Sequence, residues 1–424
     1  MDRKAMVLAV GAALAAPSAL AQLKSPAGSD WEFYGKFYPE FAHISGGGQT
    51  SSTVGLTTLA PTLTNGGNSN LVSRTEMLVS NTYIGFRGSK DIGNQMKAIW
   101  QMEQTVSLDE GTNSTLATRD TFVGIASRDW GTLRLGFMDT PFKKAGDVVG
   151  FLGVSSGNFV QTNPLLRQVG FSNAAGGPSN SASRFHERRG NAIDFASRDF
   201  FGGLSYLVQY SLGSQANPSE TSITNTPKRF PRVVSQAVKW EAGPLYLAAM
   251  NEVHFDFFGG STNATAAESN AADGRVNSKD MANQLTAMYK VGGHTFEVDY
   301  TWKYYKENGQ DSNTPNGRFL YYKNQAWMAA WEARWSNTWR SALTFVHASE
   351  GNCALFATPC STSGLEGKQV SLGGSYYLDP SVYLFLIGSK VINGASARYD
   401  NVSNGSPANG EDVTQVALGL SYTF

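Results

Sequence analysis

The sequence lacks an excess of charge of either sign. Its 424 residues include 34 Lys and Arg against 34 Asp and Glu, so the formal net charge at pH 7 is zero. Proteins that bind nucleic acid usually concentrate basic residues where they meet the phosphates. We therefore expect no nucleic acid among the partners of this protein.

Long apolar runs are missing beyond the N-terminus. After residue 21, no run reaches the roughly eighteen apolar residues that mark a membrane-spanning helix, so a helical membrane protein is excluded. Before that point, a basic start is followed by the apolar stretch Met6–Ala16 and the small residues of Ala19-Leu20-Ala21. This order is typical of a cleaved export signal. We expect a signal peptide at residues 1–21 and a single domain at residues 22–424.

Cysteine and histidine are scarce. Cys353 and Cys360 are the two cysteines, and in an exported protein two cysteines so close together are expected to form a disulfide. A metal site would need more ligands, and His347 is the one candidate nearby. None of the five histidines lies in a recognisable nucleophile motif. We therefore expect no enzymatic activity, no metal and no other cofactor.

Alternating polarity is the pattern that the sequence does contain, and it is clearest at the C-terminus. Val416, Leu418, Leu420, Tyr422 and Phe424 fall on one face, with small or polar residues between them. A period of two residues indicates a β-strand. An apolar face that ends in an aromatic residue, opposite a polar face, is expected where lipid lies on one side and water on the other.

Similar segments recur along the chain, and their number predicts a barrel. Sixteen strands would be even and within the range of outer-membrane barrels. Short connections with turn residues, such as Asp91–Asn94 and Val291–Gly293, alternate with long polar ones, such as Ser45–Leu71 and Gly259–Asp280. We predict an all-β, sixteen-stranded antiparallel transmembrane barrel. The predicted strands are Trp31–His43, Asn81–Ser89, Gln95–Val106, Arg119–Ser127, Thr132–Phe137, Asn191–Ser197, Leu204–Tyr210, Val233–Trp240, Leu245–Phe255, Asn283–Lys290, Thr295–Tyr305, Asn324–Trp335, Trp339–His347, Lys368–Tyr377, Val382–Lys390 and Val413–Phe424.

Charged residues on these strands should face the lumen. Arg87 opposes Ile84 and Phe86 across its strand, and Lys97 opposes Met96 and its apolar neighbours. A charge at the middle of the bilayer costs roughly 2–4 kcal/mol, which makes the lipid-facing orientation unfavourable. Arg87 and Lys97 are therefore expected to line the pore.

Several short motifs resemble the trimeric general porins of Gram-negative outer membranes, particularly the betaproteobacterial branch. The motifs are Tyr34-Gly-Lys36, Tyr83–Ser89, Asp91–Gly93, Lys97–Glu103, Phe122–Ile125, Trp130–Gly136 and the closing Tyr422-Thr-Phe424. The resemblance covers about residues 31–210 and the last strand. It implies a homotrimer in the cell outer membrane and a third outer loop, about Asp139–Glu187, that folds into the lumen.

The same resemblance implies the partners and the function. Small hydrophilic solutes and ions would cross such a channel passively. Outer-membrane lipid and lipopolysaccharide would surround it, and the barrel-assembly machinery would recognise the C-terminal strand that ends in Phe424.

The resemblance also implies a constriction that filters solutes by charge. Lys36, Arg119 and Arg188 match basic wall positions of the family, Tyr83 stands where many relatives have an arginine, and Arg134 is a further lumen residue. The inward loop would contribute two acids and two lysines. These loop residues are Asp139, Lys143, Lys144 and Asp147. Excess positive charge in a low-dielectric constriction favours anions, so we expect a mild preference for them.

Two other classes of function fit part of the pattern. A barrel with a plugged lumen could serve as an adhesin or structural protein, with the inward loop as the plug. A soluble exported β-protein, such as a lectin, would also have alternating strands. Conductance across a lipid bilayer separates the plugged barrel from an open channel, and a soluble periplasmic location would identify the soluble protein.

Overall fold

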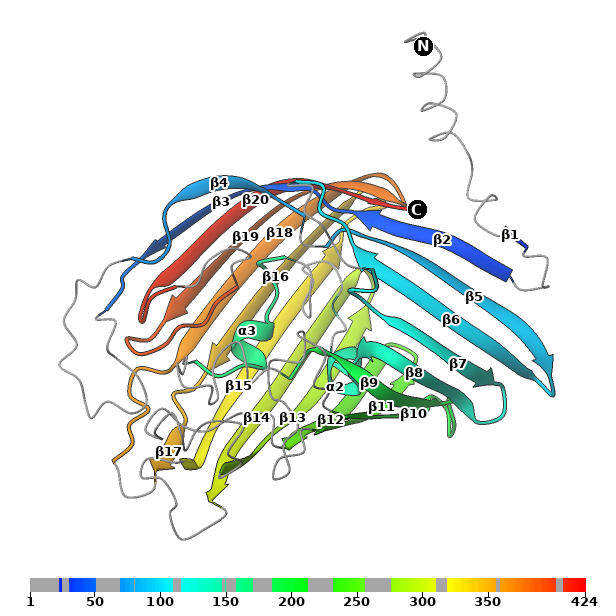
Figure 1. Cartoon of the computed structure of the whole chain (residues 1–424). Helices are drawn as coiled ribbons and strands as arrows, with labels where there is room; N and C mark the ends of the chain where they lie inside the picture. The colour runs from blue at the N-terminus through cyan, green and yellow to red at the C-terminus, as the bar shows by residue number, and fades with distance from the viewer. Residues whose placement is uncertain are drawn as a thin grey trace.

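A computed structural model describes most of the chain (Figure 1). The described residues are 23–24, 30–50, 69–79, 81–109, 116–146, 149, 158–170, 185–212, 232–255, 276–309, 319–355, 359–401 and 407–424. The predicted signal peptide and Asp147 lie outside these residues.

The described residues form one antiparallel sheet that closes on itself. Its strands are β1 (Leu23–Lys24), β2 (Asp30–Phe37), β3 (Glu40–Gly47), β4 (Arg74–Leu78), β5 (Tyr83–Gly93), β6 (Met96–Thr105), β7 (Thr121–Ser127), β8 (Gly131–Asp139), β9 (Arg188–Ser197), β10 (Leu204–Leu212), β11 (Arg232–Ala242), β12 (Leu245–Phe255), β13 (Val276–Val291), β14 (His294–Gly309), β15 (Phe319–Arg334), β16 (Trp339–Ala348), β17 (Asn352–Leu355), β18 (Gly367–Asp379), β19 (Val382–Asn393) and β20 (Asp412–Thr423). β20 pairs with β19 on one side and with β2 and β3 on the other, which closes the barrel.

The predicted count of sixteen strands is confirmed. β2 and β3 are two halves of the first strand, separated at Tyr38 and Pro39, and β4 and β5 are two halves of the second. Proline has no backbone N–H to donate to a ladder, so an interruption at Pro39 is expected. The short β17 continues the pairing of β15 beyond β16.

Three strands extend further than the sequence pattern predicted. β13, β14 and β15 each contain 16 residues, and β13 begins at Val276 rather than Asn283. Their added ends contain Lys306 and Lys323, and polar residues occur there on both faces. A strand end that lies in water on both sides loses the alternation by which strands are recognised, although its ladder continues.

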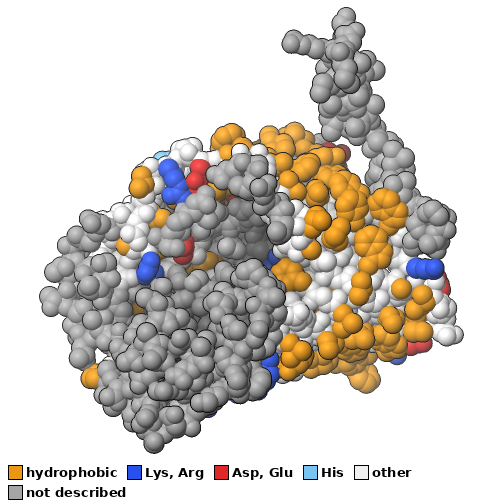
Figure 2. All heavy atoms as spheres, in the orientation of Figure 1, with side chains coloured by type: hydrophobic (Ala, Val, Ile, Leu, Met, Phe, Trp, Pro, Cys, Tyr) orange, Lys and Arg blue, Asp and Glu red, His pale blue; other side chains and the backbone are white. Residues whose placement is uncertain are grey.

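The outer face of the barrel is apolar, as predicted. On β20, Leu418 points outward and is 59% exposed, whereas the neighbouring Ala417 points inward and is 1% exposed. Figure 2 shows hydrophobic side chains gathered on the outer surface around the place where β2 and β5–β7 lie in Figure 1. Among the described residues, no helix is long and apolar enough to cross a membrane.

The C-terminal residue completes the seam between the first and last strands. The backbone N–H and C=O of Phe424 both bond to Gly35, at 3.0 Å each. The Phe424 ring lies 5.4 Å from the ring of Phe33 and 5.3 Å from that of Phe37. A Cβ atom on Gly35 would lie 2.6 Å from the Phe424 ring, so this close approach requires glycine.

The connection between β8 and β9, which we call the inward segment (residues 139–187), carries two short helices inside the barrel (Figure 1). They are α2 (Pro141–Ala145) and α3 (Asn163–Leu166). Thr140 caps α2 by accepting a hydrogen bond from the Lys143 N–H, and Pro141 occupies the first turn, where a missing N–H costs nothing.

Candidate functional site

The inward segment covers one side of the inner wall and leaves the other side open. Its apolar residues pack against β10–β13 and against β15, β16 and β19 in separate clusters, which include Phe142 with Met250 and Leu165 with Met328. Inward-facing side chains of β12–β15 are buried beneath it, whereas most of those of β5–β8 remain partly exposed, with the buried Glu103 as an exception. The remaining lumen therefore follows β5–β8, where most of the predicted site residues lie.

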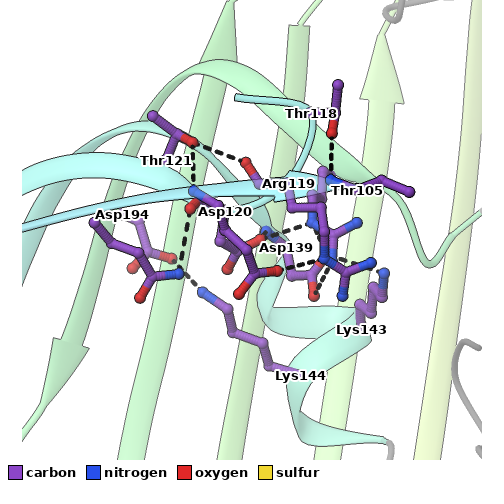
Figure 3. A network of polar contacts seen from close by, with 12 residues as sticks. Thr105, Thr118, Arg119, Asp120, Thr121, Asp139, Lys143, Lys144 and Asp194 are labelled. Carbon is purple, nitrogen blue, oxygen red and sulfur yellow. Dashed lines mark hydrogen bonds and ion pairs between the residues drawn. The ribbon is translucent and has the colours of Figure 1, made fainter. Parts of the chain in front are cut away.

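Arg188 belongs to a polar network near the ends of the inward segment. Figure 3 shows part of this network, with Asp120, Asp139 and Lys143 labelled. Its Nε lies 2.8 Å from an oxygen of Asp120 and 3.0 Å from an oxygen of Asp139. Lys143, from α2, lies 2.9 Å from the same Asp139 carboxylate. One arginine of β9 thus joins the start of β7, the end of β8 and the inward segment.

Arg119 makes a second group on the neighbouring strands. Its Nε bonds to the Glu103 carboxylate, and its guanidinium lies over the Tyr83 ring at 4.7 Å from the centroid. The hydroxyl of Tyr34 donates to the other oxygen of Glu103 at 3.0 Å. The resemblance implies an arginine at position 83. Tyr83 adds no charge there, and its ring instead holds the guanidinium of Arg119.

Arg134 and Lys144 share a carboxylate. The Arg134 Nε donates to Asp194 at 2.8 Å. The Lys144 ammonium lies 3.9 Å from the other oxygen of Asp194, and Figure 3 shows these two side chains. Lys144 belongs to the inward segment, and burial, with Arg134 as a like-charged neighbour, lowers the pKa of Lys144. The nearby Asp194 opposes this effect.

Within the described part of the chain, three other predicted pore residues form no ion pair with the groups around Arg188, Arg119 and Arg134. Arg87 bonds to Glu32 and lies over the Tyr34 ring, and its side chain is 56% exposed to the lumen. Lys36 lies over the Tyr38 ring at 4.5 Å. Lys97 lies opposite Asp91 in the register of β5 and β6, beside the short turn between these strands and away from the inward segment.

Sequence reasoning missed the acidic partners of the wall arginines. These partners are Glu32, Glu103, Asp120 and Asp194, and all lie on or beside barrel strands. The wall arginines therefore pair mostly with acids of the wall itself, and Arg188 also contacts Asp139 at the start of the inward segment. The alternating pattern of the strands could have placed these acids on the inner face of the barrel. It does not reveal which acid meets which arginine.

The predicted disulfide is present in the structure. Cys353 and Cys360 are bonded, with their Cα atoms 5.9 Å apart, and they pack against a cluster that includes Tyr322 and Leu355. Within the described ranges, no group of three or more His, Cys, Asp and Glu side chains is arranged to hold a metal ion.

Solved structures share the fold. The chain resembles the anion-selective porin from Comamonas acidovorans with a TM-score of 0.64 and 16% identity, covering 93% of this chain and all of that one. It resembles OmpT of Vibrio cholerae with a TM-score of 0.59 and 10% identity, over 95% and 99% of the two chains. At such identities the likeness establishes the barrel fold.

Sequence relatives match over shorter stretches. The major outer membrane protein P.IA of Neisseria meningitidis serogroup C is 37% identical over 97 residues, which is 21% of this chain and 24% of that protein. The major outer membrane protein P.IB of Neisseria meningitidis serogroup B (strain H44/76) is 33% identical over 133 residues, 31% of this chain and 33% of the relative. These matches therefore span a third or less of each relative.

The family comparison extends much further along the chain. The model of the Gram-negative porin family matches residues 5–388, which include most of the barrel and the whole inward segment. Together with the closed barrel, this match shows that the chain belongs to the Gram-negative porins and is a β-barrel protein of the outer membrane.

Proposed function

We propose that this porin is a passive diffusion channel for small hydrophilic solutes and ions, with a mild preference for anions, and that it transforms nothing chemically. The observation that carries this proposal is the surplus of cations along the open side of the lumen. Six predicted pore residues there carry positive charge beside five carboxylates. The cations are Arg87, Arg119, Arg134, Lys143, Lys144 and Arg188, and the carboxylates are Glu32, Glu103, Asp120, Asp139 and Asp194.

The pairing of these charges explains why the preference is mild. An ion that passes an arginine bonded to a carboxylate experiences a dipole more than a full charge, and the field of a dipole declines faster with distance. Lys36 and Lys97 are two further cations on this side of the wall, with Asp91 opposite Lys97 in the strand register. A narrow passage with low-dielectric walls concentrates the field of such residual charges on the pore axis.

Reversal potentials in planar bilayers under a salt gradient test this function directly. We expect a potential of the sign that anion preference produces, and a smaller one for Arg188→Ala, which leaves Asp120 and Asp139 without their shared cation. As the matched control, Asp120→Asn should change the potential in the opposite direction. Clear cation preference of the unmutated channel would contradict the proposed selectivity.

Failure to conduct at all would support the alternative of a barrel plugged by the inward segment, acting as an adhesin or structural protein. The partial exposure of the inward-facing side chains on β5–β8 favours the open channel. A plugged lumen would instead bury the inward-facing side chains on every side of the barrel.

We also propose that the channel works as a homotrimer. A trimer form of Vibrio cholerae OmpT has the same fold, with a TM-score of 0.58. On this chain, β3 and β20 present large exposed apolar side chains at the seam, with Phe41 65% and Leu418 59% exposed. Lipid and lipopolysaccharide would cover the remaining outer face, and the barrel-assembly machinery would recognise the strand that ends in Phe424.

A further inference from the structure

A buried histidine outside the predicted site lies between two carboxylates. His254 is on the inner face of β12 and is 0% exposed. Its Nδ1 lies 2.9 Å from Asp280 on β13, and its Nε2 lies 2.8 Å from Glu252, two residues earlier on β12. The two-residue spacing places Glu252 and His254 on the same face of the strand.

This geometry determines the charge of the imidazole. A neutral imidazole has one N–H, whereas both ring nitrogens of His254 face carboxylate oxygens. Both contacts are hydrogen bonds only when the ring is an imidazolium that donates from each nitrogen. A buried charge persists where it is paired and hydrogen-bonded, and His254 satisfies both conditions.

The same cluster touches both ends of the inward segment. The Phe185 ring, near the returning end, stacks on the imidazole with centroids 4.7 Å apart and an interplanar angle of 15°. At the departing end, the Thr140 hydroxyl lies beside the Glu252 carboxylate. The two ends also meet directly, because the Thr140 N–H donates to the Glu187 carbonyl at 3.3 Å.

We propose that His254 is a positioning residue of the channel: its imidazolium clasps both ends of the inward segment to the wall, and loss of its proton releases them and narrows the passage. The inference rests on the proposed channel function. Without the proton, one ring nitrogen of His254 presents a lone pair to the carboxylate beside it. That carboxylate loses its hydrogen bond and the cation that balanced its buried charge.

The direction of movement follows from the layout of the lumen. The segment lies against the β10–β13 wall, and the open space is on the side of β5–β8. Released ends therefore move toward the open passage. Other contacts also hold the segment. Near its departing end the Phe142 N–H donates to Ser235 at 3.0 Å, and further along the Val149 N–H donates to Glu297 at 2.7 Å. Loss of the proton therefore loosens the ends while the barrel itself stays assembled.

Other titratable groups surround the cluster and must be separated from His254. Arg189 of β9 is a cation that acts electrostatically on the imidazole. Glu252 and Asp280 are the two carboxylates that face the imidazole. His186 of the inward segment lies 4.0 Å from Glu187 and provides a second imidazole, so His186→Gln is a necessary comparison.

The experiment is single-channel recording of the full-length channel between about pH 6 and pH 10, a span that begins near the ordinary titration of histidine. The unmutated channel should show a downward step in unitary conductance as pH rises. His254→Gln cannot carry the charge, so it should show the lower conductance at every pH and no step. His186→Gln and the control His347→Gln, on the outer face of β16, should keep the step.

Asp280→Asn provides a second measurement if His254→Gln does not assemble. It removes one negative charge beside the imidazolium, so the conductance step should move to lower pH. Equal conductance of the unmutated channel and His254→Gln at each pH would overturn the inference, and so would a step that Asp280→Asn leaves in place. An unmutated protein without any conductance would instead contradict the proposed channel.

Discussion

The guanidinium of Arg119 lies over the ring of Tyr83, 4.7 Å from its centroid, while its Nε bonds to Glu103. The ring attracts the cation through its quadrupole, and the carboxylate fixes the orientation of the side chain. A neutral residue at position 83 therefore holds one cation in place where the resemblance implies a second. This relationship is one physical reason to expect a weak ion preference.

Replacing Tyr83 by arginine should strengthen the anion preference. A charge about 10 Å from a passing ion in a water-like dielectric changes its energy by ~0.4 kcal/mol, or about twofold in the permeability ratio. Tyr83→Phe keeps the ring under Arg119 and should leave the reversal potential close to that of the unmutated channel. Equal shifts for both variants would show that the added charge is not the cause.

Lys144 should make the anion preference depend on pH. Burial lowers the pKa of Lys144, so this lysine loses its charge at a lower pH than an exposed lysine. As pH rises, reversal potentials should therefore begin to move toward zero before the pH reaches the ordinary lysine pKa near 10.4. Lys144→Gln should remove that change. Lys97→Gln, at a more exposed lysine, is the control.

The stability of the barrel should also change with pH over this range, and it should rise while the anion preference falls. Because folding lowers the pKa of Lys144, the unfolded chain binds the proton more tightly than the barrel does. The folded barrel gains stability as pH rises from the lowered pKa to the ordinary lysine value. Chemical unfolding at two pH values would show an opposite trend if Lys144 were stabilised in its charged form.

The disulfide should protect both cysteines without being needed for transport. Cys353 and Cys360 are bonded in an outer connection, away from β5–β8. Maleimide should label neither residue in denatured, unreduced protein and both after reduction. A short closed loop of this kind contributes ~2–3 kcal/mol by loop entropy, so the double serine variant should loosen that connection and keep its unitary conductance. Two labelled thiols before reduction would refute the bond in the exported protein.

Apolar residues at the seam should hold the trimer together. Phe41 and Leu418 are register partners on β3 and β20, and both point outward. Burying a side chain of this size contributes ~1.5–3 kcal/mol, so Phe41→Ser combined with Leu418→Ser should yield monomers in unheated, mild-detergent electrophoresis. Leu285→Ser, on β13 and 50% exposed, should leave the trimer intact. A monomeric unmutated protein would contradict the trimer itself.

The sequence by itself determined the architecture. Alternation with a period of two residues identifies strands and their two faces, and the spacing of the strands predicts sixteen of them. The outward position of Leu418 and the inward position of Arg134 follow from the same pattern. This information is local, because each strand records in its own residues which side meets lipid and which side meets water. The disulfide was predictable for a similar reason, since its cysteines are close in the chain.

Tertiary structure alone decided which side chains meet. Arg134 and Asp194 are 60 residues apart, and they pair because β8 and β9 have a register that places them opposite one another. His254 meets Asp280 across β12 and β13 and meets Phe185 through the fold of the inward segment. Alternation assigns each residue to a face but carries no information on the register between strands. The ion pairs and the histidine clasp depend on that register, because hydrogen bonds require contact within about 3 Å.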